Sequence, residues 1–230
     1  MRIWDIDPGY LNRQSLLGEH RELHGIVSII SGNKQGYSRH PETRRWVGYG
    51  WALKQRHRLL ASEMSLRGYH DQSPVRLRAN KGVWPDTYID DPDTQILLLA
   101  KKYEKLEQGR IVLPGNPQQL WAQHKYSVMA RDIPLYQSLG KSVANTKADR
   151  PRLINELVEV LRILPTEGGI RNTLQHMWGY VSDLYAGHRH DLERWTSTRL
   201  LRETRKLAVS SSNRYLLSST ALGELGAWIN

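Results

Sequence analysis

Residues 12–32 read NRQSLLGEHRELHGIVSIISG, and their periodicity indicates the fold class. The leucines and isoleucines recur three or four residues apart, the spacing of an amphipathic helix. Asn12 is placed to cap this helix, and the Ser31-Gly32-Asn33 sequence is placed to end it. Similar capped segments follow along the chain, and none shows the alternation typical of a strand. We therefore predict an all-α protein.

The predicted helices divide into two packed helical domains, residues 1–110 and 111–230, joined by an irregular connection that contains proline and glycine. In the first domain the pattern predicts helices over 12–32, 41–68 and 93–108, with an irregular segment over 70–92. In the second domain it predicts helices over 117–130, 133–144, 151–164, 170–186 and 189–208.

The charge is strongly positive and unevenly distributed. The net charge is +10, and residues 34–81 hold eleven Lys or Arg against three Asp or Glu. Such an excess favours a polyanion as partner, because phosphate binding releases counterions; the alternative is a basic surface that only aids solubility. No apolar run suits a membrane span or a signal core, so we expect a cytoplasmic protein. The absence of cysteine excludes disulfides and thiolate chemistry.

The N-terminal residues suggest amine chemistry. An α-amine has a pKa of roughly 7.7 to 8.0, against about 10.4 for lysine, and so becomes nucleophilic near neutral pH. Initiator methionine is removed mainly before small residues, so the large Arg2 should keep Met1 as the mature terminus. We expect the Met1 amine to act as a nucleophile.

A carboxylate lies in a row of small residues on the first predicted helix. Ser15, Gly18 and Gly25 share one face of that helix with Glu22. Two interior glycines destabilise a helix by about 1 kcal/mol each relative to alanine, which a functional approach by a ligand would explain. The alternative is close helix packing against the glycines, with Glu22 solvated and paired to an arginine.

Four short motifs stand out in the first part of the chain. They are Met1-Arg2-Ile3, Gln14, Arg21-Glu22-Leu23 and Leu66-Arg67-Gly68-Tyr69. With these motifs, about residues 1–75 resemble the endonuclease V-type pyrimidine dimer DNA glycosylases.

The resemblance implies an enzyme that excises damaged nucleotides, pyrimidine dimers among them, and nicks the strand as an abasic-site lyase. The Met1 amine would attack the deoxyribose C1′ and form an imine, and the Glu22 carboxylate would support the sugar cation and the β-elimination. Arg2 and Arg21 would hold phosphates, and Gln14 would contact DNA. Damaged duplex DNA is then the partner. No metal or other cofactor is needed, because the imine itself serves as the electron sink.

The chain also departs from the family. The viral members begin with threonine where this chain has Met1, Ser15 replaces a histidine, and Gly25 replaces an arginine. These changes affect substrate contacts.

A basic loop and the helix that follows it supply further candidates for phosphate contact: Arg39, His40, Arg44 and Arg45. The alternative for these residues is a solvated helix surface.

The second half resembles a bacterial helical domain of unassigned function that also occurs attached to desulfidase-type domains. The resemblance covers about residues 115–220 and is carried by the sequence HKYSVMAR at 124–131 and by Leu139-Gly140. It implies RNA, tRNA included, or DNA as a ligand, with Lys125 and Arg131 as candidate contacts.

Three other functions remain open. His20 and His24, with further ligands in 188–191, suggest a metal-dependent hydrolase, although Arg21 stands where a zinc-protease helix has glutamate. A second alternative is a non-catalytic DNA- or RNA-binding protein. A third is an RNA-directed nuclease; a ribose 2′-hydroxyl replaces one of the protons that β-elimination uses, which favours deoxyribose.

Overall fold

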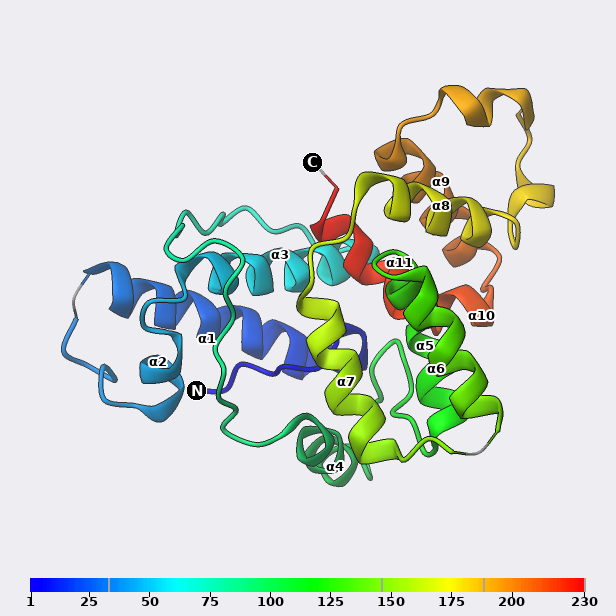
Figure 1. Cartoon of the computed structure of the whole chain (residues 1–230). Helices are drawn as coiled ribbons and strands as arrows, with labels where there is room; N and C mark the ends of the chain where they lie inside the picture. Colours follow the sequence, from blue (N-terminus) through cyan, green and yellow to red (C-terminus); the bar gives the residue numbers. More distant parts are fainter. Residues whose placement is uncertain (33, 146, 188, 230) are drawn as a thin grey trace. The chain divides into compact units, whose positions relative to one another are not determined.

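The computed structural model describes residues 1–32, 34–145, 147–187 and 189–229, with the backbone alone for 189–191. Every secondary-structure element in these ranges is a helix, which confirms the all-α prediction. The chain separates into two compact units, Met1–Gly109 and Arg110–Asn230 (Figure 1). Within the described ranges, no helix has both the length and the apolar character needed to cross a membrane.

Unit 1 is built on two long antiparallel helices, α1 and α3, which lie side by side (Figure 1). Leu16, Leu23 and Ile26 of α1 and Leu53 and Leu60 of α3 are fully buried. Their spacing is the helical period read from the sequence. The elements of unit 1 are η1 (Pro8–Tyr10), α1 (Arg13–Gly32), α2 (Pro41–Trp46), α3 (Gly50–Leu66) and α4 (Pro92–Lys102).

The start of α1 follows the prediction. The backbone N–H of Ser15 donates to Asn12 Oδ1 at 2.9 Å, which makes Asn12 the N-cap. The N–H of Asn12 itself donates to the hydroxyl of Tyr103 at 3.0 Å. The cap therefore also fixes α1 against the end of α4.

The prediction of a single helix over 41–68 is wrong. It is two helices, α2 and α3, separated at Val47–Tyr49. Gly48 has φ +87°, a left-handed conformation that glycine adopts without strain. Beyond this turn, the N–H of Trp51 donates to the carbonyl of Ala79 at 2.9 Å. The break thus lets α3 begin against the later irregular segment.

The segment between α3 and α4 is irregular, as predicted, and is fixed to the helices. Arg45 Nε donates to the Thr87 carbonyl at 2.7 Å, and Val75 is buried. The helix expected over 93–108 ends at Lys102 instead. Beyond the helix, a Cβ on Gly109 would lie 2.5 Å from backbone atoms of Tyr10, so glycine is needed where the chain passes this close.

Unit 2 packs around α5, which contacts α6, α7, α8 and α11. Side-chain caps followed by proline start α5, α6 and α7, where the sequence predicted them. The elements are α5 (Pro117–Met129), α6 (Ile133–Ala144), α7 (Arg150–Arg162), α8 (Glu167–Trp178), η2 (Ser182–Leu184), η3 (Arg189–Arg194), α9 (Ser197–Ser210), α10 (Arg214–Leu217), α11 (Thr220–Glu224) and η4 (Leu225–Ala227).

Two predicted helices in unit 2 need correction. The helix expected over 170–186 begins at Glu167 and ends at Trp178, and the one expected over 189–208 begins at Ser197. Thr166 and Thr196 cap these starts through their hydroxyls, a signal that the apolar pattern alone did not show. The short helices α10 and α11 were not predicted.

His124 of α5 gives unit 2 a testable pH dependence. Burial, with a smaller effect of Arg131, lowers the pKa of His124 to about 3. Between that value and the ordinary 6.5 the unfolded chain binds one more proton than the folded chain. The free energy of unfolding is therefore unaffected by His124 above about pH 6.5. As the pH is lowered below that value, it decreases by at most about 1.4 kcal/mol per pH unit.

We expect His124→Gln to flatten the pH dependence of the free energy of unfolding between pH 7 and pH 5, measured by urea denaturation. His176→Gln, at an exposed position of α8, should leave the slope unchanged. Equal slopes for His124→Gln and the parent protein would contradict the assignment.

Candidate active site

The N-terminal segment is held through its backbone. The N–H groups of four consecutive residues each donate to a side-chain oxygen, while the Ile3 side chain is buried in the core. The pairs are Arg2 with Glu22, Ile3 with Glu42, Trp4 with Glu19 at 3.2 Å and Asp5 with Gln95 at 2.8 Å. The start of the chain thus has one defined course alongside α1.

This arrangement places the Met1 amine beside Glu22. The Arg2 N–H donates to Glu22 Oε2. The Met1 nitrogen is three covalent bonds from the Arg2 nitrogen, so it lies within about 7 Å of that carboxylate oxygen. Met1 and Glu22 are both partly exposed. The Met1 nitrogen and the Glu22 carboxylate therefore lie close together on a partly exposed part of unit 1.

The surface of α1 next to Glu22 is open. A Cβ built on Gly18 or Gly25 would meet no described atom within 4 Å, so the alternative of close helix packing against these glycines is not observed. At about 100° per residue, Gly18, Gly25, Gln14 and Arg21 all lie within about 100° of Glu22 around the helix. Gln14 and Arg21 are exposed. We call the surface of α1 formed by Gly18, Glu22 and Gly25 the open strip. It leaves room for a ligand and is flanked by the polar side chains of Gln14 and Arg21.

Arg2 is fixed from the other side. Its Nη1 pairs with Asp90, and its guanidinium lies 4.5 Å from the centre of the Trp4 ring. Its Nη2 is buried and has no hydrogen-bond partner in the described part of the chain. Asp90 therefore competes for the guanidinium that the resemblance assigns to a phosphate.

A buried ion pair between Arg56 and Glu19 helps to hold the N-terminal segment in place. Arg56 of α3 donates to both carboxylate oxygens of Glu19, at 2.7 and 2.9 Å, and to the Ile6 carbonyl at 2.8 Å. Burial alone would lower the pKa of Arg56, but the charge of Glu19 raises it above its ordinary value. Glu19 thereby joins α1, α3 and the N-terminal segment.

We expect Arg56→Met to destabilise the protein by about 3–5 kcal/mol, because it leaves the Glu19 carboxylate buried without its partner. Urea denaturation measures this loss. Arg44→Met, which removes an exposed arginine of α2, should change the free energy of unfolding by less than about 0.5 kcal/mol. Similar values for the two variants would contradict the role of the pair.

Residues 1–77 match the family described as pyrimidine dimer DNA glycosylase. We call these residues the glycosylase-like segment. The match covers a third of the chain and includes Met1, Arg2 and Glu22. It supports a DNA-repair glycosylase function for the N-terminal region, and such an enzyme implies DNA as substrate.

Residues 125–193 match a second family, described as a protein of unknown function (DUF1722). The two matches support the suggestion that the chain joins two different families. No curated protein and no solved structure matches the chain.

Only part of the predicted phosphate-binding set is available in the glycosylase-like segment. Arg39 and Arg44 are exposed. His40 caps α2, accepting the Glu42 N–H at its Nδ1 at 3.2 Å. Arg45 does not suit the predicted role: its guanidinium is 3% exposed and pairs with Asp5 and Glu42. It helps to position the N-terminal segment instead.

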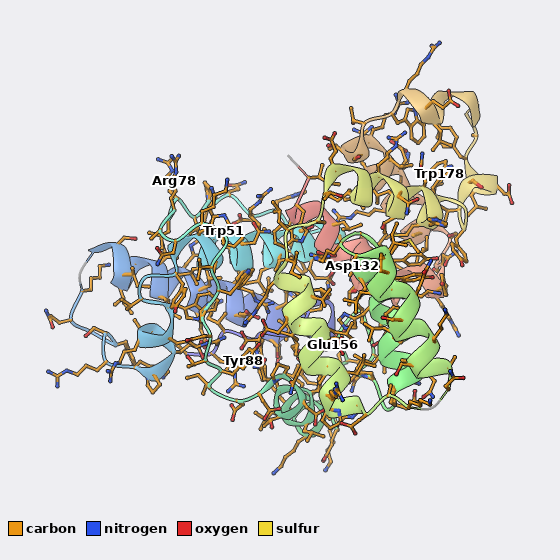
Figure 2. All side chains as sticks on the ribbon, viewed as in Figure 1. Trp51, Arg78, Tyr88, Asp132, Glu156 and Trp178 are labelled. Atoms are coloured by element: carbon orange, nitrogen blue, oxygen red, sulfur yellow. The ribbon has the colours of Figure 1, made fainter. Side chains whose placement is uncertain are left out.

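Other exposed cations were not singled out from the sequence. Arg76, Arg78 and Lys81 are exposed on the segment after α3, and Arg78 extends away from the ribbon (Figure 2). A run of charges within an irregular segment gave no periodic signal. Together with Lys34, Arg39 and Arg44, these are the exposed cations of residues 34–81.

The two candidates in unit 2 are held by their own neighbours. Lys125 Nζ lies 5.3 and 5.1 Å from the ring centres of Tyr126 and Tyr215. The side chain of Arg131 is buried, makes a two-pronged pair with Glu224 at 2.9 and 3.1 Å, and also donates to backbone carbonyls. A buried arginine with these partners stabilises unit 2 and is not placed to grip a phosphate.

The structure also brings His20 and His24 together with two residues that the sequence analysis missed. His57 of α3 and Asp71 lie against them, and the four potential ligand atoms are within 4.8 Å of one another. The sequence analysis also considered metal ligands in residues 188–191. The side chains of these residues lie outside the part of the chain that the structure describes.

Proposed function

We propose that unit 1 is a DNA glycosylase and abasic-site lyase of the endonuclease V type, with the Met1 amine as nucleophile and Glu22 as the acid–base carboxylate. The observation that supports this most directly is the hydrogen bond from the Arg2 N–H to Glu22, which keeps the amine and the carboxylate adjacent. The match of residues 1–77 to the pyrimidine dimer glycosylase family supports the same chemistry.

The reaction proceeds in balanced steps. The unprotonated amine forms a bond to C1′, and the base leaves with the electrons of the glycosidic bond. The nitrogen then releases a proton, and the ring C1′–O4′ bond opens as a protonated imine forms at C1′ and O4′ takes up a proton. Loss of a C2′ proton to the Glu22 carboxylate expels the 3′-phosphate and nicks the strand. Water finally hydrolyses the imine and returns the free Met1 amine. Glu22 therefore acts on the sugar, within hydrogen-bond reach or through one water.

The open strip on α1 fits an extruded nucleotide. C1′ is shielded inside a duplex, so the damaged nucleotide must leave the stack, which costs a few kcal/mol and least at damaged sites. Gly18 and Gly25 leave space beside Glu22 for a sugar. Arg21 and Gln14 border this space, and Arg39 and Arg44 provide exposed charge for flanking phosphates.

The proposal assigns DNA binding to unit 1 alone. The Arg131 side chain, one of the two nucleic-acid contacts expected in unit 2, is buried and paired with Glu224.

A nicking assay with a chelator separates the proposed lyase from its alternatives. The protein is incubated with an end-labelled duplex carrying an abasic site or ultraviolet lesions, with and without chelator. Nicking that persists in chelator and leaves a β-elimination end supports the lyase. Nicking abolished by chelator while the helix content is unchanged favours a metal-dependent nuclease, and binding without nicking favours a non-catalytic protein. A matched RNA strand should remain intact, and its cleavage would favour the RNA-directed alternative.

A further inference from the structure

Three histidines and one aspartate converge on the side of α1 that faces away from Glu22. His20 and His24 come from α1, His57 from α3, and Asp71 from the segment after α3. The three ring centres are 4.7, 5.0 and 4.9 Å apart, nearly an equilateral triangle. At about 100° per residue, His20 and His24 lie about 160° from Glu22 around the helix. The cluster is therefore separate from the proposed lyase site.

The four ligand atoms lie within 4.8 Å of one another, and three of the separations between them are close to those of a tetrahedral metal site. His20 Nε2 is 3.2 Å from His57 Nε2 and 3.2 Å from Asp71 Oδ1, and His57 Nε2 is 3.4 Å from Asp71 Oδ2. Ligand bonds of about 2.0–2.2 Å to one tetrahedral zinc ion give ligand–ligand separations of about 3.3–3.6 Å. Three edges of the cluster thus approach the separations that a bound ion imposes.

Hydrogen bonds alone leave this cluster poorly satisfied. His20 Nε2 and His57 Nε2 face each other and also face the same carboxylate, yet a neutral imidazole nitrogen carries at most one proton. If both donate to Asp71, their N–H groups oppose each other; if only one does, the other nitrogen turns a lone pair toward the carboxylate. His24 Nε2 is buried and has no hydrogen-bond partner among the described residues. A cation at the centre would satisfy all these lone pairs.

The protonation states suit metal binding at neutral pH. Burial, with the charge of His24, lowers the pKa of His20, and burial lowers the pKa of His57 to about 4. Burial alone would raise the pKa of Asp71, but a hydrogen bond from the Ser73 N–H at 3.0 Å and the neighbouring histidines lower it. Neutral imidazoles and an ionised carboxylate are the forms that bind divalent metals. The Ser73 N–H also orients the carboxylate from outside.

We propose that His20, His24, His57 and Asp71 form a structural site for one divalent transition-metal ion, with zinc the best match to three imidazoles and one carboxylate. Four protein ligands fill a tetrahedral shell, so the site has no open position for a substrate. The ion would tie α1 and α3 to the start of the segment that carries Arg76 and Arg78. This proposal is independent of the imine chemistry, for which we expected no metal.

The test uses the full chain, freed of metal with a chelator and titrated with Co²⁺, whose visible absorption reports tetrahedral coordination. We expect saturation at one Co²⁺ per chain and displacement by Zn²⁺. Zinc at about 100 times its dissociation constant should raise the thermal midpoint by roughly 5–10 °C.

Two variants and one control determine whether these residues hold the ion. Asp71→Asn removes the carboxylate ligand without changing the size of the side chain, at a position outside the helices. His57→Gln removes a buried imidazole ligand. Loss of a residue that only hydrogen-bonds to a metal ligand typically lowers metal affinity by about 10- to 100-fold. Each of these two variants should lower Co²⁺ affinity by more than that. His70→Gln changes the exposed neighbour of Asp71 and should bind like the parent.

Circular dichroism first establishes that the parent and Asp71→Asn have equal helix content. If His57→Gln does not fold, the comparison of these two proteins still decides the test. Absence of saturable binding, or binding that survives Asp71→Asn, overturns the proposal. Glu22→Gln should keep the metal while losing nicking, so failure of the metal site and failure of the lyase are distinguishable.

Discussion

Replacing Glu22 with glutamine is expected to lower strand nicking by roughly 10²- to 10⁴-fold, the usual contribution of a general acid or base. The amide keeps an oxygen that can accept the Arg2 N–H, so the N-terminal segment should keep its course. What the amide cannot do is accept the C2′ proton or stabilise a sugar cation by charge. Single-turnover nicking of an abasic duplex measures the loss.

The matched control is Glu104→Gln, which removes an exposed carboxylate of the same unit. Both variants should bind the duplex like the parent protein. Undiminished turnover in Glu22→Gln would remove Glu22 from the mechanism.

Adding one residue before Met1 is expected to reduce nicking by at least about 10²-fold. The added residue moves the free amine by up to about 3.6 Å, and even a 1 Å misplacement of a reacting group can cost about that factor. The hydrogen bonds at Arg2, Ile3, Trp4 and Asp5 hold the rest of the segment in place, so the chain has little freedom to retract. The former Met1 nitrogen becomes an amide and loses its nucleophilicity.

Binding of the extended protein to DNA should stay within about twofold of the parent, because the exposed cations that meet phosphates are unchanged. Selective acetylation of the α-amine near neutral pH, where lysines are largely protonated, provides a second route to the same loss. Full activity after either change would show that another amine carries the reaction.

Much of the fold was predictable because local signals agree with one another. The helices that begin at Asn12, Asn116, Asp132 and Asp149 each combine a side-chain cap with an apolar stripe, and proline follows in all but the first. The errors lie where tertiary contacts decide. Gly48 breaks a periodic stretch where α3 begins against Ala79, and α4 ends at Lys102, before the chain passes close to the Tyr10 backbone at Gly109.

The site was predictable only in part. The terminus and Glu22 stand out in the sequence through chemistry and spacing, whereas Glu19, Glu42 and Gln95 look like ordinary helix residues until the fold brings them to the N-terminal segment. Charge patterning also did not reveal that Arg45 and Arg131 are buried, because a sequence does not show which arginine pairs with a buried carboxylate. His57 and Asp71 join His20 and His24 only through the packing of α1 on α3.

The most direct test of the central claim is to identify the amine that bonds to DNA. Borohydride is added during the reaction with an abasic duplex, the imine is reduced to a stable adduct, and the modified peptide is located by mass spectrometry after proteolysis. The account predicts one adduct, on the α-amine of Met1, formed equally with chelator present. An adduct on a lysine such as Lys54, or a nicking reaction that borohydride never traps, would contradict it.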